Sequence, residues 1–481
     1  MICRRNKQII TLLLFLIIFS LILLFVIDIK MGLIVALILT SISIFIKPEI
    51  GLGLLVFSLP FKMVGNIYIG FNFRLSYWIF ALTLFAWLMH RFIKRDFKFL
   101  RTPLDFPLFL FLFIAVISVF QSRFIPPDAP ILLGAFRNLP WIKSISRIFL
   151  LIFMIIIYYF IIHFVKNEKT IKYALLFLFI SSVAVSIYGL YGFTAYYLDL
   201  PTHIGNWNTI VKPSPLILDP PRIRSTEMEP LFFGNYLLSI IPVALSLFFL
   251  KQKFISRRLL FLVIFVDSLA LILTFSRGVW FAFIISILFF IIIQGRILLQ
   301  NKKILISLGL IAIIIFLVFS PLLIPQITGV FNTSSAKFWS VKMRLISINY
   351  ALIAFKNHPI LGIGYENYNF YSGNKIYVGL DPNPINLSEP NNYPIKILAE
   401  MGIIGFVAGV WLYIQIILMV WRVIKKTKID LYKNLATGYL VAFIGVTTQL
   451  LFFSTITFVY LWVMLGLIIA ASKLVKNEKY I

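Results

Sequence analysis

The sequence of 481 residues consists largely of long apolar segments that alternate with short polar ones. A helix that crosses a lipid bilayer needs about 20 consecutive apolar residues, with a range of about 17 to 25. On this template the pattern predicts fourteen spans. The segment at 50–61 is short and either re-enters the membrane or continues past Pro60, so twelve to fourteen is the safer count. The predicted spans lie at 9–27, 31–46, 50–61, 75–90, 106–121, 146–164, 171–193, 231–250, 259–275, 277–294, 304–323, 394–421, 434–454 and 456–472.

Composition supports the same class of protein. Hydrophobic residues make up 61% of the chain and charged residues 13%, whereas a soluble domain has roughly 45–50% apolar and about 25% charged residues. This much apolar surface must be solvated by lipid, so we predict an all-α polytopic membrane helical bundle. The first apolar segment lacks a small-residue cleavage site and is interpreted as a retained span. The single cysteine, Cys3, excludes a disulfide framework and a cysteine-ligated metal.

The basic residues predict the orientation, because cytoplasmic loops carry an excess of lysine and arginine. If the chain starts inside and the spans alternate, most of the 44 basic residues fall in the inner segments, and both termini are cytoplasmic. The net charge of +27 is therefore explained mainly by topology and by attraction to anionic lipid. Nucleic-acid binding is not expected, since the basic runs are short juxtamembrane loops without interleaved aromatic residues.

The spans divide the chain into three parts. Residues 1–323 hold the first eleven spans with external segments at 122–145 and 194–230, residues 324–393 form a large external loop, and residues 394–481 hold the last spans. Loops beyond about 15 residues are usually functional or disordered. Within the large loop, apolar residues recur at near-helical spacing from Ser335 to Asn357, which predicts an amphipathic helix on the outer leaflet. Pro359, followed by Gly362 and Gly364, predicts the turn that ends this helix.

Four stretches, in this order, resemble the O-antigen ligase and O-antigen polymerase superfamily of membrane glycan-transfer enzymes. They cover roughly residues 221–410, and each alone is a weak signal. All four fall on the predicted outer face. The stretches are PRIRSTEMEPLFFGNYL from Pro221, LTFSRGVWFAF from Leu273, AFKNHPILGIGYENY from Ala354 and EPNNYPIKILAEMGIIGF from Glu389.

The resemblance implies a glycosyltransferase of the bacterial inner membrane with its active site on the external face. Its substrate would be a glycan linked to undecaprenyl diphosphate, which is transferred to a hydroxyl of a glycan or lipid acceptor during surface polysaccharide biosynthesis. In ligases that acceptor is the lipid A core of lipopolysaccharide, and in polymerases it is another lipid-linked repeat unit. No cofactor, nucleotide sugar or metal is expected.

Arginines are suited to this reaction, since negative charge builds on the diphosphate as the glycosidic bond breaks. A guanidinium stays protonated and binds phosphate through a planar fork of donors. Arg277 begins a predicted helix, whose N-terminal amides would add to an anion site. Arg222 and Arg224 lie two residues apart and would share a face if their segment is extended. Arg222 matches the family's arginine position better, and an interfacial, snorkelling role is the alternative for Arg277.

One position departs from the family. The ligase pattern has a His-Asn pair whose histidine is the proposed base for the acceptor hydroxyl, and the matching residues here are Asn391 and Asn392. Asparagine cannot accept that proton. Either another residue is the base, with Glu389 as the nearest candidate, or no strong base is needed because departure of the leaving group dominates. This favours a polymerase or a divergent ligase.

The remaining candidates have weaker support. His358 and Lys396 are candidate substrate-binding residues, with a structural role favoured for His358. Glu400 is costly in lipid and should face the bundle, paired with Lys396 one turn away. Asp267 lies mid-span and is either functional or bonded to neighbouring hydroxyls. General electrostatics or lipid head-group contacts are favoured for four external basic residues, Arg123, Arg137, Lys143 and Arg147.

A membrane transporter or a flippase of lipid-linked glycans is the alternative function. Transporters commonly show repeated halves and broken helices at mid-depth, and no internal repeat is visible here. The location of the arginines discriminates between the two functions. Clustering with Glu389 on one side of the membrane supports transfer chemistry, whereas scattering along a two-sided channel supports transport.

Overall fold

The computed structural model confirms an all-α membrane bundle. It describes residues 29–63, 67–68, 72–95, 100–124, 139–204, 207–212, 219–250, 254–300, 302–373 and 389–477. The predicted span at 9–27, Cys3 and Arg137 lie outside these ranges. The longer helices are α2 (Ile29–Ile46), α3 (Pro48–Phe57), α4 (Leu75–Ile93), α5 (Asp105–Ser118), α6 (Pro140–Phe164), α7 (Glu168–Tyr197), α8 (Pro230–Phe248), α11 (Arg277–Gln300), α12 (Lys302–Thr328), α13 (Ala336–Asn357), α15 (Tyr393–Lys426), α16 (Asp430–Gln449) and α17 (Val459–Asn477).

Shorter elements complete the chain. A π-helical turn, η3 (Val263–Asp267), lies between α9 (Arg257–Leu262) and α10 (Ser268–Ile272), and α14 (Tyr368–Gly373) precedes α15. The 3-10 turns are η1 (Val119–Phe124) and η4 (Leu450–Phe452). Three antiparallel two-residue pairs are formed by β1 (Ile67–Tyr68) with β2 (Asn72–Phe73), β3 (His203–Ile204) with β4 (Trp207–Asn208), and β5 (Ile210–Val211) with β6 (Arg222–Ile223).

The helices agree with the predicted spans. Every predicted span within the described residues falls on helical structure, and eight helices of this part of the chain are long and apolar enough to cross a membrane. The segment at 50–61 is different: α3 has 10 residues and ends at Phe57, so it rises only about 15 Å. That length is too short to cross the hydrocarbon layer.

The centre of the bundle is α8, in which every residue from Phe233 to Leu247 is buried. Small residues let its neighbours approach closely. Gly438 of α16 lies against Val243, and Gly234 of α8 lies against Val279 of α11. Close helix contacts through small residues are typical of membrane bundles, where lipid removes the hydrophobic force between helices.

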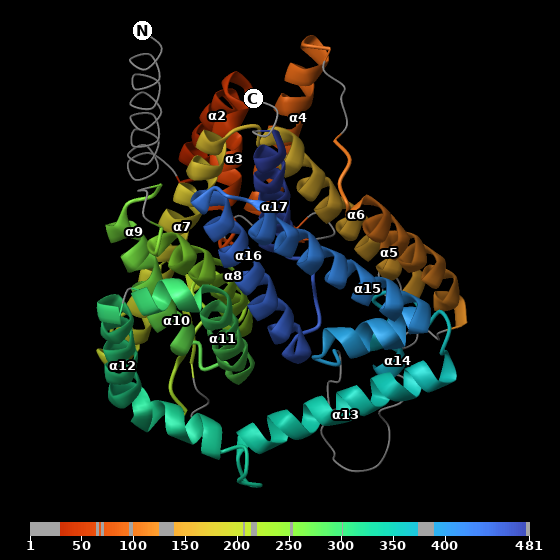
Figure 1. The fold of residues 1–481 in the computed structure, drawn as a ribbon. Helices are drawn as coiled ribbons and strands as arrows, with labels where there is room; N and C mark the ends of the chain where they lie inside the picture. The colour runs from red at the N-terminus through yellow and green to blue at the C-terminus, as the bar shows by residue number, and fades with distance from the viewer. Residues whose placement is uncertain are drawn as a thin grey trace.

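The long helix α13 crosses one end of the bundle (Figure 1). The helix predicted in the large loop is therefore present. Its buried residues are Ser347, Ala351 and Ala354, while two of the apolar residues at helical spacing, Leu345 and Leu352, are exposed on the protein surface. Small side chains occupy the buried face of α13 because this helix packs closely on the turn after it and on α15, beside Tyr368 and Ala399.

Candidate active site

Arg222 belongs to a short extended segment that packs beside the start of α11. Its strand β6 pairs with β5, and the Ile223 amide donates to the Leu273 carbonyl at 3.0 Å. The Arg222 Nε donates to the Thr274 carbonyl at 3.1 Å. These two bonds fix Arg222 against the connection between α10 and α11, one turn before Arg277.

Arg277 is the first residue of α11, as its motif predicted. Phe275, two residues earlier, has a φ of +47°, a left-handed conformation that costs a bulky residue energy and that clusters at functional sites. The Arg277 Nη1 is buried without a hydrogen-bond partner. The guanidinium and the free amides at the helix start therefore form a site suited to an anion.

Arg344, in the middle of α13, is the third arginine of this group. The Lys337 Nζ of the same helix contacts the Asp219 Oδ1 at 2.6 Å, which ties α13 to the segment before β6. Residues 337 and 344 lie seven positions apart and so share a face of the helix. The charge of Arg344 acts on both Arg222 and Arg277. We call Arg222, Arg277 and Arg344 the arginine site.

The arginine site has more positive charge than its protein neighbours neutralise. Burial, and then the charge of Arg344, lower the pKa of the Arg222 guanidinium, while Glu229 and Asp219 only partly oppose them. Burial and Arg277 likewise lower the pKa of Arg344. Among the described residues, no carboxylate forms an ion pair with any of the three. Since arginine keeps its proton, this arrangement favours a bound anion.

Arg224 faces different surroundings from Arg222. Its Nε donates to the Asn208 carbonyl at 2.9 Å, and its Nη1 donates to the Met228 carbonyl at 3.4 Å. Both bonds hold the loop around β4 and β6 together. Of the two arginines, Arg222 is thus the one directed toward Arg277 and Arg344.

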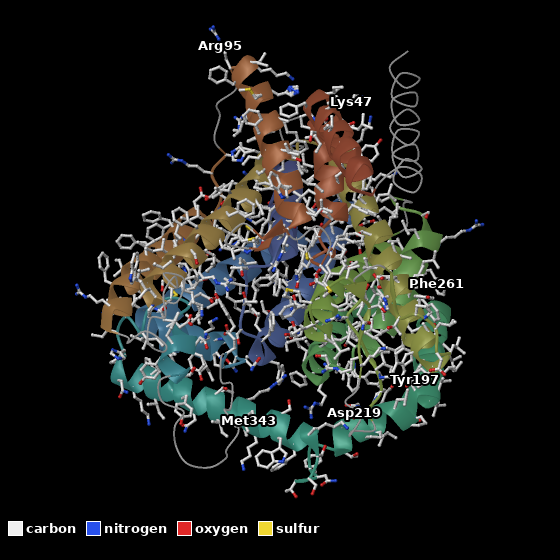
Figure 2. All side chains as sticks on the ribbon, turned by 180° about the vertical axis from the view of Figure 1, so that it is seen from behind. Lys47, Arg95, Tyr197, Asp219, Phe261 and Met343 are labelled. Atoms are coloured by element: carbon white, nitrogen blue, oxygen red, sulfur yellow. The ribbon has the colours of Figure 1, made fainter. Side chains whose placement is uncertain are left out.

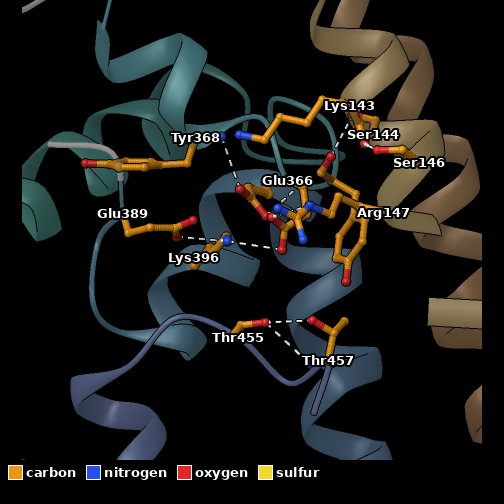
Figure 3. Close-up of polar contacts among 12 residues, drawn as sticks. Lys143, Ser144, Ser146, Arg147, Glu366, Tyr368, Glu389, Lys396, Thr455 and Thr457 are labelled. Carbon is orange, nitrogen blue, oxygen red and sulfur yellow. Dashed lines mark hydrogen bonds and ion pairs between the residues drawn. The ribbon is translucent and has the colours of Figure 1, made fainter. Parts of the chain in front are cut away.

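A second charged group surrounds Lys396 in the first turn of α15. The Lys396 Nζ lies 2.9 Å from the Glu389 Oε2 and 3.1 Å from the Glu366 Oε1 (Figure 3). Lys396 is buried, whereas the Glu389 side chain is 41% exposed. We call Lys396, Glu366 and Glu389 the lysine–glutamate site. It offers one accessible carboxylate that is held in place by a buried ammonium group.

Two basic residues of α6 face this site. The Arg147 Nε lies 3.8 Å from the Glu366 Oε2, and the Lys143 Nζ lies over the Phe370 ring at 5.0 Å. Burial alone would raise the pKa of the Glu366 carboxyl, but Lys396, Arg147 and Lys143 outweigh it and lower the pKa. A general electrostatic role was expected for Arg147 and Lys143. The structure gives them defined contacts around the lysine–glutamate site.

Backbone contacts lock the glycine turn onto a break in α15. Gly362 and Gly364 have φ values of +68° and +94°, and Gly402, inside α15, has +64°. The Gly364 amide donates to the Glu400 carbonyl at 2.8 Å, and the Ile403 amide donates to the Pro359 carbonyl at 2.9 Å. A Cβ at Gly402 would collide with the Ile360 backbone. The third and fourth motifs therefore form one unit.

The predicted pair between Glu400 and Lys396 is wrong. The Glu400 carboxylate instead accepts from the Glu366 amide at 2.9 Å and the Tyr368 amide at 3.1 Å. Its oxygens are occupied by the turn that leads into α14. Lys396 pairs with Glu366 and Glu389, because the locked turn brings Glu366 onto α15 from 30 residues away.

Three other predicted residues have local contacts that shape the loop. Asn391 has a left-handed φ of +49°, and its Nδ2 donates to the Glu389 carbonyl at 3.2 Å. Asn392 caps α15, accepting from the Ile395 amide at 3.1 Å. His358 is the C-cap residue of α13, and its ring packs edge-on against Tyr371.

The arginine site and the lysine–glutamate site lie at the same end of the bundle. They are linked through η4. Phe452 packs on Gly278, next to Arg277, and the Leu451 carbonyl accepts from the Asn392 Nδ2 at 3.1 Å. Figure 2 places Asp219 and Met343, neighbours of these sites, at the end opposite Lys47 and Arg95.

An apolar cavity of about 470 Å³ extends to the first turn of α15, next to the lysine–glutamate site. It lies between α5, α15, α16 and α17, and its wall includes Tyr393 and Ile397, on either side of Lys396, and Leu450 and Leu451 of η4. Val410 lines it from the exposed face of α15. The cavity is suited to a hydrocarbon chain whose polar end reaches the charged residues. Sequence periodicity gave no sign of it.

Among the described residues, no group of three or more His, Cys, Asp or Glu side chains is placed to hold a metal ion. The two sites offer cations, carboxylates and a helix start. Together with the fold, they define a multi-pass membrane protein with concentrated charge at one end.

Residues 259–410 match the family model described as O-Antigen ligase. The match confirms the resemblance and supports a membrane ligase or polymerase role in polysaccharide biosynthesis. The matched range contains Arg277, Arg344 and the lysine–glutamate site, while Arg222 lies before it. A comparison with curated proteins gives no match.

Sequence reasoning missed Arg344 and Glu366. The signal for Arg344 was available, because Lys337 and Arg344 share one face of a predicted external helix. Glu366 lies within the third motif, in YENY, but nothing in its spacing pointed to Lys396.

Proposed function

We propose that the chain is a glycosyltransferase that takes a glycan from a polyprenyl-diphosphate carrier, of the undecaprenyl type, and transfers it to an acceptor hydroxyl. The observation that carries the proposal is the arginine site: Arg222, Arg277 and Arg344 converge from three segments without a paired carboxylate among the described residues. A diphosphate supplies the missing negative charge.

In the proposed reaction, the bond between the sugar's anomeric carbon and the diphosphate oxygen breaks. The bonding electrons leave with the diphosphate, and the acceptor oxygen forms the new bond to the anomeric carbon. Pre-aimed guanidinium groups stabilise the charge that develops on the leaving group. The arginines therefore act more strongly in the transition state than on the intact donor, which is the condition for catalysis.

We assign the acceptor's proton to Glu389. Its carboxylate is accessible and is positioned by Lys396 at 2.9 Å, whereas the asparagines at 391 and 392 cannot take a proton. A proton held by Glu389 completes the balance, since the acceptor hydroxyl loses it as the new glycosidic bond forms.

The apolar cavity would hold the isoprenoid chain of the donor. Its wall is formed mostly by apolar side chains and continues toward the lipid-facing side of α15 at Val410. A carrier that enters sideways from the bilayer could then place its diphosphate at the arginine site while its tail stays out of water.

We propose that the end covered by α13 faces outward from the bacterial inner membrane, with both termini in the cytoplasm. The positive-inside rule supports this orientation, because Lys47 and Arg95 lie at the opposite end (Figure 2). A donor carried in the outer leaflet would then meet both sites directly.

The transporter alternative fits the charge distribution less well. Arg222, Arg277 and Arg344 gather at one end with Glu389, and a two-sided path would need charged groups spread along it. An assay in detergent separates the two functions. Detergent leaves no compartments, so a flippase would leave the lipid-linked glycan chemically unchanged.

The proposed function is tested by incubating purified protein in detergent with a lipid-linked repeat unit. We expect release of polyprenyl diphosphate and a longer glycan. Arg277→Ala should lower kcat by about 10²–10³-fold, the usual effect of removing one charge-stabilising group. Elongation without another acceptor would mark a polymerase, and a requirement for a second acceptor would mark a ligase.

The matched control is Arg258→Ala, an exposed arginine at the start of α9, which should retain activity. Both variants should insert and purify as the parent does. Full activity of Arg277→Ala, or a lipid-linked glycan that the parent protein leaves unchanged both without and with a second acceptor, would overturn the proposal.

A further inference from the structure

Helix α13 is anchored unevenly along its length. Its buried residues, Ser347, Ala351 and Ala354, all lie in its second half, where the helix packs on the turn after it and on α15. No residue from 336 to 346 is buried. Apolar packing therefore holds the second half of α13, whereas Arg344 of the arginine site lies in the half without a buried residue.

The Asp219 carboxylate ties this first half of α13 to the rest of the protein. Its Oδ1 accepts from the Lys337 Nζ at 2.6 Å and from the Gln326 Nε2 of α12 at 3.2 Å. Gln326 and Lys337 flank the elbow at 329–335 that joins α12 to α13. The Ser335 Oγ caps α13 by accepting from the Lys337 amide at 3.1 Å. Asp219 thus gathers both arms of the elbow on the segment before β6.

The spacing between Asp219 and Arg222 is stiff, because the two residues between them are both prolines. A proline fixes its own φ and restricts the residue before it to extended conformations. An extended spacer of about 3.1 Å per residue places Arg222 about 9 Å beyond Asp219. On α13, Arg344 follows Lys337 by seven residues, which is about 10 Å along one face of the helix. The two spans are nearly equal, so the contact between Asp219 and Lys337 sets where Arg344 meets Arg222.

We propose that Asp219 and Lys337 are positioning residues for the transfer reaction. Their ion pair holds Arg344 beside Arg222 and Arg277, so that three guanidinium groups face one diphosphate. Neither Asp219 nor Lys337 needs to touch the substrate. The proposal rests on the proposed function, since it names the residues that complete its donor site.

A purely electrostatic role for the two residues makes a different prediction. Asp219 is a negative charge three residues from Arg222, so its loss would make the arginine site more positive and strengthen diphosphate binding. Loss of the Lys337 charge would do the opposite. A positioning role predicts the same result for both changes, because either one breaks the ion pair. The direction of the two effects therefore separates the two roles.

The kinetic test compares Asp219→Ala with Lys337→Met in the assay with a lipid-linked repeat unit. We expect kcat to fall by about 10- to 100-fold in both variants, since a misplacement of about 1 Å can cost a site that much. The swapped pair, Asp219→Lys with Lys337→Glu, keeps the net charge and restores the attraction. It should recover most of the parent's kcat.

Lys342→Met is the matched control. It removes the same charge from the exposed side of α13, where the Lys342 Nζ lies over the Trp339 ring at 4.6 Å. This variant should behave as the parent does in the transfer assay, because the contact between Asp219 and Lys337 stays intact.

Hydrogen exchange gives a second readout that needs no substrate. Amides of residues 336–346 should exchange faster in Asp219→Ala and Lys337→Met, because this half of α13 loses its tie. Amides of residues 347–357 should stay protected by their packing on α15. The swapped pair should return the exchange of 336–346 to the parent's rate. Mass spectrometry of the purified protein in detergent follows the two halves separately.

Opposite changes in the KM for the donor in the two single variants, with kcat unchanged, would overturn the proposal in favour of a purely electrostatic role. Unchanged exchange in both single variants would overturn it as well, by showing that the ion pair does not hold α13. If the swapped pair fails to fold, the two single variants still decide. An inactive parent protein would instead refute the proposed function, and this proposal with it.

Discussion

At the residue scale, the proposed chemistry depends on which charges are paired and which are free. Lys396 is buried between two carboxylates, whereas Arg222, Arg277 and Arg344 make no ion pair among the described residues. Paired charges rigidify a site, and unpaired cations keep their field for a ligand. The lysine–glutamate site is thus suited to hold a base in position, and the arginine site is suited to bind the substrate.

Glu389→Gln tests the proposed base. The amide keeps the shape of the side chain but cannot accept a proton, so kcat should fall by about 10²–10⁴-fold, the usual contribution of a general base. KM for the lipid-linked donor should change little, because the arginine site is intact. Steady-state kinetics of the purified protein measures both constants.

Glu168→Gln, an exposed residue at the start of α7, is the matched control and should behave as the parent. An unchanged kcat in Glu389→Gln would mean that departure of the leaving group dominates. In that case Lys396 and Glu366 would have a structural role only.

At the scale of elements, the essential connection is the one between the glycine turn and α15. The turn from His358 to Gly364 joins α15 at Gly402 through backbone hydrogen bonds, and it carries Glu366 to Lys396. This contact also explains why a helix of 34 residues is broken near its start. The break separates a short arm with Lys396 and Glu400 from the long membrane-spanning part.

Gly402→Ala tests this connection. A Cβ in this conformation, which is essentially restricted to glycine, is strained by about 1–3 kcal/mol and would also collide with the Ile360 backbone. We expect a lower Tm and a larger loss of activity than the stability change explains, since Glu366 would move away from Lys396. Thermal unfolding and the transfer assay measure the two effects.

Gly295→Ala, in α11, provides the control, because a Cβ there would meet no atom within 4 Å. It should leave both Tm and activity near those of the parent. Equal behaviour of the two variants would mean that the turn is not locked on Gly402.

At the scale of the whole molecule, α13 crosses the end of the bundle that holds both charged sites (Figure 1). An apolar cavity between α5, α15, α16 and α17 extends to the first turn of α15, next to the lysine–glutamate site. This arrangement matches an amphiphilic donor. Its tail would remain between α15, α16 and α17, and its diphosphate would reach the arginine site at the bundle's end.

Val410→Trp tests the position of the tail. Val410 lines the cavity and is 40% exposed, so a larger side chain can narrow the cavity without overpacking the core. KM for a long-chain polyprenyl donor should rise by about tenfold, equivalent to roughly 1.4 kcal/mol. A donor with only two or three isoprene units should be used as before.

Val407→Trp, on the outer side of the same helix and 58% exposed, should leave both donors unaffected. Equal KM values for the long-chain donor in the two variants would place the tail elsewhere. The arginine site would then need a different entry route from the bilayer.

The sequence by itself determined the membrane class, the positions of the helices and the order of the four motifs. These features are local, because a helix in lipid satisfies its own backbone hydrogen bonds and needs only a run of apolar residues. It also identified Arg277, Arg222 and Glu389 as candidates through their motifs. The turn at Gly362 and Gly364 could also be predicted from the sequence, since a positive φ restricts the residue type at each position.

Only the tertiary structure decided which side chains meet. Arg222 and Arg344 belong to one site although more than a hundred residues separate them. Lys396 forms an ion pair with Glu366 and not with Glu400, because the glycine turn docks on α15. The surroundings of Asp267 likewise depend on how α7 and α8 pack against η3. Partner choice depends on the packing of segments remote in sequence, and no local pattern records that packing.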